Sequence, residues 1–180
     1  MKVKRVVTGR TEAGASVFVS VGDAPRTHDF EHIPGMSIAQ LWATPAIPRL
    51  DREAAADPTQ NQASIVPRPG GTQLMFVEFP PDQVMMSPSF EPAAAGAEQL
   101  RVAPGLAECF EIDHPGMHTT DTVDYGIVIK GEICLELDDG RVETLKAGDV
   151  VIQNGTRHAW RNRGNANALV AFVLIGAQRT

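Results

Sequence analysis

The sequence has few of the residues that build disulfide or nucleic-acid-binding proteins. Its 180 residues include only two cysteines, Cys109 and Cys134, which excludes a disulfide framework and a cysteine-rich zinc site. The 16 lysines and arginines stand against 22 aspartates and glutamates, so the net charge is −6. Because nucleic-acid-binding domains normally carry a basic face, we expect no nucleic-acid partner.

Long apolar runs are also absent. The longest run, Ala168 to Ala177, has ten residues, which is about half the length of a membrane-spanning helix. The first residues, MKVKRVVTGRTEAG, lack the apolar core of a signal peptide. We therefore expect no membrane partner and a cytoplasmic location.

The chain does have the length and composition of one folded domain over residues 1–180. Hydrophobic residues make up 43% of it and charged residues 21%, as in ordinary globular proteins. Sixteen glycines and thirteen prolines favour a turn-rich β protein over a helical bundle.

The most regular zone, residues 107–177, contains six short runs typical of β-strands. They are separated by short turns, and no amphipathic helix lies between them, so they predict an all-β antiparallel sandwich or barrel. Their sequences are DYGIVIKG, EICLEL, RVETLK, DVVIQ, RHAWRN and ALVAFVLI. An earlier run with the same character, TQLMFVEF (Thr72–Phe79), is expected to complete the closed core of the barrel with Tyr125–Ile175. We expect the N-terminal strands, KRVVTG, ASVFVS and SIAQLWAT, to be added to one sheet.

Two segments interrupt this pattern. Residues 45–71 are rich in proline and polar residues and predict a long loop, with one helical turn at DREAAA. Residues 80–106 predict a second insert, either a loop or a short helix. We also interpret His28 and His32 as loop residues, because no helical apolar stripe accompanies them.

Candidate site residues share a strand face by parity. Side chains alternate between the two faces of a strand, so His118, Thr120, Thr122 and Asp124 point to one side, whereas Tyr125 faces away. His158 and Trp160 share a face in a later strand by the same rule.

If both faces point inward, His118, Asp124 and His158 converge at an open mouth of the barrel. Two imidazoles and one carboxylate suit Fe(II), Mn(II), Ni(II) or Zn(II) and leave coordination positions open for substrate. The same three side chains without a metal can act as general acid and base. Both possibilities stay open from the residues alone.

The residues around Asp124 resemble the first motif of the cupin family, G-x5-H-x-H-x3,4-E-x6-G. Asp124 takes the place of the glutamate, six residues before Gly131. His118 and Thr120 fall at the two histidine positions, so a threonine replaces the second histidine.

The segment GDVVIQNGTRHAWRN resembles the second cupin motif, G-x5-P-x-G-x2-H-x3-N. Gln153 replaces the proline and the first spacer is one residue short. The residues that match are Gly148, Gly155, His158 and Asn162.

This resemblance implies a double-stranded β-helix, or jelly-roll, barrel. It also implies a divalent metal held by His118, Asp124 and His158, which would be the catalytic residues, with Thr120 too weak to act as a ligand. His114 could substitute for the missing ligand, although Pro115 and Gly116 exclude a helical pair with His118. The side chains expected in the substrate pocket are Thr120, Thr122, Trp160 and Phe172, with Val128 adding to its apolar lining.

Two functions remain open at this point. The first is a metal-dependent small-molecule enzyme, such as a dioxygenase, decarboxylase, isomerase or dehydratase acting on an aromatic or organic-acid substrate. The second is a metal-free cupin that binds a small ligand without turnover. We further expect a homodimer, because the strands Val3–Thr8 and Ser16–Ser20 would otherwise be exposed edges.

Overall fold

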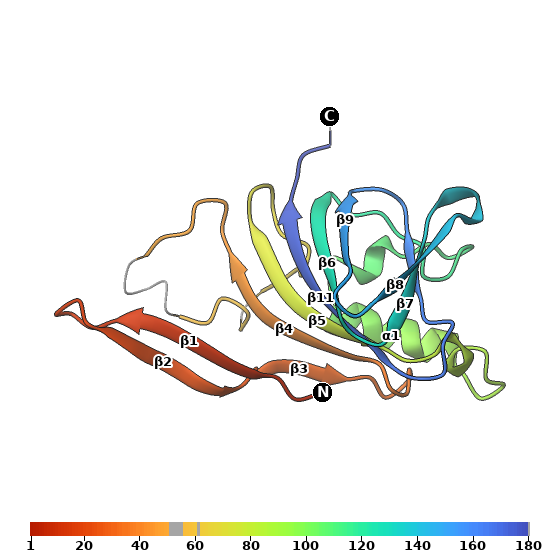
Figure 1. Cartoon of the computed structure of the whole chain (residues 1–180), viewed down its shortest axis with the longest axis horizontal. Helices are drawn as coiled ribbons and strands as arrows, with labels where there is room; N and C mark the ends of the chain where they lie inside the picture. Colours follow the sequence, from red (N-terminus) through yellow and green to blue (C-terminus); the bar gives the residue numbers. More distant parts are fainter. Residues whose placement is uncertain (51–55, 61, 180) are drawn as a thin grey trace.

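The largest element of the fold is a six-stranded antiparallel sheet. The computed structural model describes residues 1–50, 56–60 and 62–179, so most of the predicted helical turn at DREAAA lies outside the described residues. The strand order in this sheet is β3-β4-β5-β11-β6-β9 (Figure 1). The strands are β3 (Arg26–Asp29), β4 (Ser37–Thr44), β5 (Thr72–Phe79), β6 (Thr122–Lys130), β9 (Val150–Asn154) and β11 (Ala168–Gly176).

A second, three-stranded sheet packs against the first. It has the order β10-β7-β8 and consists of β7 (Glu132–Glu136), β8 (Val142–Lys146) and β10 (Ala159–Arg161). All six runs predicted between residues 107 and 177 are strands, and the predicted all-β barrel is confirmed. The turn between β7 and β8 contains the short 3₁₀ segment Asp138–Gly140.

The main core lies between the two sheets. Alternating side chains of β6 show why: Thr122, Asp124, Gly126 and Val128 are buried, whereas the intervening residues lie toward or at the surface. The large sheet contributes Val128, Val170 and Phe172 to the core, and the small sheet contributes Ile133, Leu135 and Leu145.

A helix covers one opening of this core. Residues 80–106, for which the sequence left a loop or a short helix open, contain α1 (Pro92–Val102) and the 3₁₀ turn Asp82–Val84; a second 3₁₀ turn, Ala107–Cys109, follows. Pro92 begins the helix at a position where its missing N–H costs no hydrogen bond. The helix buries Ala95, Glu98 and Val102. None of the helices in the described part of the chain has the length and apolar character needed to cross a membrane.

The N-terminal strands depart from the prediction. β1 (Lys4–Arg10) and β2 (Ser16–Asp23) pair only with each other and form an arm that extends away from the barrel, so only the later strands β3 and β4 are added to the large sheet (Figure 1). His28, interpreted as a loop residue, lies in β3 and is hydrogen-bonded to Glu98. β3 has four residues, which is too short for an alternating pattern to reveal it.

The turn between β6 and β7 requires a glycine at position 131, and substitution there tests this requirement. The φ of Gly131 is +79°, and a Cβ atom there would lie 2.9 Å from the backbone oxygen of Asn167. We expect Gly131→Ala to lower the free energy of unfolding by about 1–3 kcal/mol, because it adds a backbone clash to an unfavourable dihedral angle. Urea unfolding followed by circular dichroism measures the change.

The matched control is Gly140→Ala, where φ is +67° and nothing lies within 4 Å of the added Cβ. That variant carries only the dihedral penalty, so its loss should be smaller. Equal losses in the two variants would contradict a close approach at Gly131.

Candidate functional site

A cavity of about 450 Å³ lies between the two sheets under α1. Most of its wall is apolar and includes Phe30, Ile33, Met75, Val77, Phe79, Leu106, Phe110, Trp160, Phe172 and Leu174. The polar side chains at the wall are Asp82, Gln99, His118, Thr120, Asp124, His158, Arg161 and Arg163. The cavity therefore suits a ligand with an apolar body and few polar groups.

His118 and His158 are brought together by their backbones. The N–H of each donates to the carbonyl oxygen of the other, at 2.9 Å and 3.0 Å, and the two ring centroids are 4.2 Å apart. The predicted convergence of these two side chains is thus present. The sequence predicted that His158 lies at an open mouth of the barrel. It is only 3% exposed and lies instead at the inner wall of the cavity.

Both imidazoles are neutral near pH 7. Burial lowers the pKa of His118 to about 4, with a further contribution from the neighbouring His158, and burial also lowers the pKa of His158. Nδ1 of His118 lies 3.1 Å from the carbonyl oxygen of Gly116, and Nδ1 of His158 lies 2.9 Å from that of Thr156. Because a carbonyl can only accept, each Nδ1 carries the proton and each Nε2 keeps its lone pair.

Asp124 reaches the same cavity as a buried carboxylate. Its Oδ1 atom has no hydrogen-bond partner among the described residues. Burial raises its pKa to about 6, and an interaction with Thr122 opposes the shift. A buried carboxyl group with an unpartnered oxygen costs stability, and such groups are characteristic of functional sites.

The four predicted pocket residues divide into two groups. Thr120, Trp160 and Phe172 line the cavity, and the rings of Trp160 and Phe172 are 5.3 Å apart. Thr122 does not line it; its hydroxyl lies 2.8 Å from that of Thr120 and supports that residue from behind. Val128 also lies off the cavity, in the core between the sheets.

The donor atoms fit a divalent ion through the histidine pair. Two neutral imidazoles with fixed Nδ1 atoms and free Nε2 lone pairs are typical metal ligands, and the unpartnered oxygen of Asp124 is of a type that binds the same ions. Within the described ranges, however, no three His, Cys, Asp or Glu side chains are grouped closely enough to hold a metal. The structure brings two of the three predicted ligands together, and Asp124 as the third stays a prediction. His114 lies outside the cavity, with Nδ1 3.3 Å from Glu111.

Glu98 is an important residue that the sequence did not reveal. It is buried in α1 and accepts hydrogen bonds from the backbone N–H groups of Glu31 and His32, at 3.0 Å and 2.9 Å. Nε2 of His28 lies 2.7 Å from the same carboxylate. Because Gln99 of α1 and Ala103, which directly follows the helix, line the cavity, Glu98 fixes the helix that closes it.

Comparison with known proteins finds similarity to cupin-domain proteins. The model of the cupin domain matches residues 110–175. Phomopsin biosynthesis cluster protein C' of Diaporthe leptostromiformis is 49% identical over 63 residues, which are 34% of this chain and 33% of that protein. The cupin-domain-containing oxidoreductase virC of Hypocrea virens is 46% identical over 62 residues, which are 33% of this chain and 32% of that protein. The matches thus cover about a third of these relatives.

A solved structure with a similar arrangement is an RmlC-like cupin family protein with a double-stranded β-helix fold from Methanocaldococcus jannaschii. It is 16% identical, the alignment covers 58% of this chain and 70% of that chain, and the TM-score is 0.37.

Glu98 gives a prediction about stability and pH. Burial acts to raise the pKa of Glu98, but its hydrogen bonds from Glu31, His28 and His32 outweigh burial and lower the pKa to about 2. A carboxyl group whose pKa is lower in the folded state stabilises the fold above its ordinary value near 4.5, and this stabilisation is lost as the pH falls toward 2. We expect Glu98→Gln to lower the free energy of unfolding at pH 7 by about 1–3 kcal/mol.

Urea unfolding between pH 7 and pH 3 measures both effects. The variant should also lose part of the wild-type decline in stability below pH 4.5. Glu91→Gln is the control, because Glu91 is an exposed residue preceding the same helix and its side chain makes no capping hydrogen bond. Identical pH profiles for wild type and Glu98→Gln would show that the carboxylate does not fix α1.

Proposed function

Because the chain belongs to the cupin superfamily, we propose that it is a small-molecule metabolic enzyme that acts on an aromatic or otherwise apolar-bodied substrate, including organic acids with such a body. One observation carries this proposal. Two neutral imidazoles and a carboxylate with one unpartnered oxygen lie at the wall of one apolar cavity. Relatives described as an oxidoreductase and as a biosynthesis cluster protein favour an enzyme over a simple binding protein.

A divalent metal, Fe, Mn, Ni or Zn, is the proposed cofactor. Nε2 of His118 and Nε2 of His158 would hold it, with Asp124 as the third ligand. When bound, such an ion would polarise a substrate oxygen or bind dioxygen. The oxidoreductase, lyase and isomerase classes are all compatible with this chemistry.

The residues of the chain have separate tasks in this proposal. Trp160 and Phe172 form an apolar wall that orients a flat substrate and excludes water. Where no metal holds it, the Asp124 carboxylate, whose pKa burial raises to about 6, can accept and return a proton close to neutral pH. Thr120 supplies a hydroxyl at the same wall, fixed by its hydrogen bond with Thr122.

The wider organisation remains part of the proposal. We propose one domain over residues 1–180, with residues 107–177 as the core that carries both motifs and with 45–71 and 80–106 as inserts. We also propose a cytoplasmic location, a small molecule as the ligand and no nucleic-acid or membrane partner.

A homodimer is supported by two exposed apolar surfaces. The arm surface consists of Val6, Val17, Phe18, Val19 and Val21 on β1 and β2. The sheet surface consists of Tyr125, Ile127, Ile129, Val150 and Ile152, where β6 pairs with the edge strand β9. The arm leaves the molecule beside β3, at the opposite end of the sheet from β9 (Figure 1). A second copy is therefore the partner that can cover the sheet surface with its arm.

Replacing His158 tests the enzymatic proposal. We expect His158→Ala to reduce bound divalent metal from about one ion per chain to nearly none, because one of two paired imidazoles is lost. Elemental analysis of purified protein measures the metal, and turnover of small aromatic acids measures activity. The buried position of His158 adds a cavity cost, so circular dichroism must show that the variant is folded.

His114→Ala is the matched control, because His114 is exposed and lies off the cavity. It should keep full metal content and activity. A wild-type protein that binds apolar small molecules without metal and without turnover would instead support the alternative, a non-catalytic ligand-binding cupin.

Light scattering tests the homodimer. We expect a mass of twice 19.4 kDa for the wild type. Phe18→Asp places a charge on the arm surface, where the side chain is 73% exposed, and should shift the mass to that of one chain at micromolar concentration. Ile112→Asp is the control, since Ile112 is 94% exposed but lies outside both surfaces. A wild-type mass of 19.4 kDa would contradict the dimer.

A further inference from the structure

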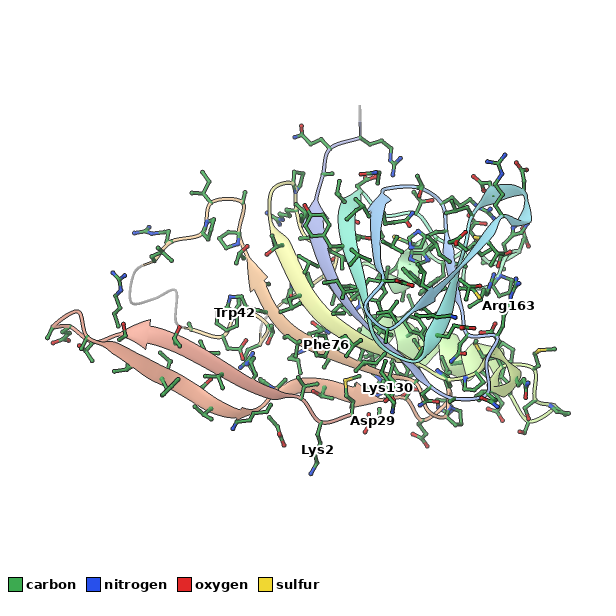
Figure 2. The ribbon with its side chains drawn as sticks, viewed as in Figure 1. Lys2, Asp29, Trp42, Phe76, Lys130 and Arg163 are labelled. Atoms are coloured by element: carbon green, nitrogen blue, oxygen red, sulfur yellow. The ribbon has the colours of Figure 1, made fainter. Side chains whose placement is uncertain are left out.

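Arg163 lines the cavity but makes no ion pair or side-chain hydrogen bond with another described residue. The neighbouring cavity arginine differs. Nε of Arg161 donates to Glu136 at 2.6 Å, and its Nη1 donates to the carbonyl oxygen of Pro115 at 2.8 Å. The guanidinium of Arg163 is therefore available to a ligand, on the side of the barrel opposite the N-terminal arm (Figure 2).

The backbone around Arg163 is held firmly. The buried Asn162 side chain donates to the carbonyl oxygens of Phe79 and Ala166, at 2.9 Å and 2.8 Å, and accepts from the N–H of Gly164 at 3.0 Å. Asp82 holds the same segment from both sides of Asn162. Its backbone N–H donates to the carbonyl oxygen of Asn162 at 2.8 Å, and its Oδ1 atom accepts from the backbone N–H of Asn162 at 3.0 Å. Because the backbone is fixed, only the side chain of Arg163 has to be ordered when a ligand binds.

Exposure distinguishes the two ends of the cavity. Arg163, Met85 and Met86 line the cavity and are exposed to solvent, so they mark its mouth. His118 and His158 are buried and mark its inner end. Arg163 follows His158 by five positions, so their Cα atoms are at most about 18 Å apart. Trp160 lies between them in the sequence, with its ring centroid 6.4 Å from that of His158, and most of the cavity wall is apolar.

We propose that Arg163 binds a carboxylate at the mouth of the cavity, so that the substrate is an acid whose apolar body extends inward to the histidine pair. This inference rests on the proposed function and adds the substrate class and its orientation. A guanidinium binds a carboxylate through two parallel hydrogen bonds. At the solvent-exposed mouth the acid keeps part of its hydration, whereas at the inner end it would lie in an apolar environment.

The nearby Asp82 carboxylate limits the choice of ligand. No ion pair joins Asp82 to Arg163 in the described structure, but the negative charge of Asp82 would disfavour a ligand with several charges at one end. A monocarboxylate therefore fits the mouth better than a diacid or a phosphate.

The experiment compares two probes that differ only in charge, naphthaleneacetate and naphthaleneacetamide, by isothermal titration calorimetry. Wild-type protein should bind the acid about tenfold more tightly than the amide, as expected for one charge-assisted contact. Arg163→Gln should remove this preference and leave the affinity for the amide unchanged. Arg141→Gln is the control, because Arg141 is an exposed arginine outside the cavity, and it should keep the tenfold preference.

The possible failures are distinguishable. If Arg163→Gln keeps the tenfold preference, or if wild-type protein shows none, the carboxylate proposal is wrong while the apolar cavity of the proposed function stands. If neither probe binds wild-type protein, both the cavity's role in the proposed function and this inference are overturned.

Discussion

The reciprocal backbone hydrogen bonds between His118 and His158 are the interaction on which the site depends. They join the segment before β6 to the start of β10, so one strand of each sheet leads directly away from the pair. The two imidazoles therefore lie side by side, with ring centroids 4.2 Å apart. Burial lowers both pKa values, and the proximity of His158 lowers that of His118 further, so both rings are neutral. Neutrality in turn leaves each Nε2 with the lone pair that either a metal or a proton requires.

This arrangement has a cost that the surrounding structure offsets. An unpartnered carboxylate oxygen at Asp124 and two desolvated imidazoles weaken the fold locally. Ion pairs stabilise the segments on which the site is built. Arg157, next to His158, donates to Glu111 at 2.6 Å and 2.7 Å, and Glu98 holds the covering helix. The site is thus kept open by contacts that lie outside it.

Regular strands were predictable from the sequence because their signals are local. Turn residues bounded the six strands from β6 to β11, and alternation in β6 correctly predicted that Asp124 and Tyr125 lie on opposite faces of the strand. Properties that depend on distant contacts were not predictable. Glu98 has the sequence context of a solvated helical residue, and only its packing against residues 28–32 buries it. Parity placed Thr122 on the correct face, but the cavity ends before it. β1 and β2 pair only with each other and form a separate arm. Whether they join the large sheet depends on the surfaces that the rest of the chain leaves uncovered, and the sequence of one segment does not contain that information.

The two ends of the cavity have different consequences for catalysis. A contact at the mouth, far from the reacting atoms, is the same in the ground state and in the transition state, so it raises affinity without lowering the barrier to reaction. Contacts at the inner end are the ones that can strengthen as charge develops on the substrate. In the proposed enzyme, Arg163 would therefore determine which acids enter and in which orientation, whereas His118, Asp124 and His158 would carry the reaction. Because these two groups share no hydrogen bond, substrate preference can change at the mouth while the inner chemistry is kept.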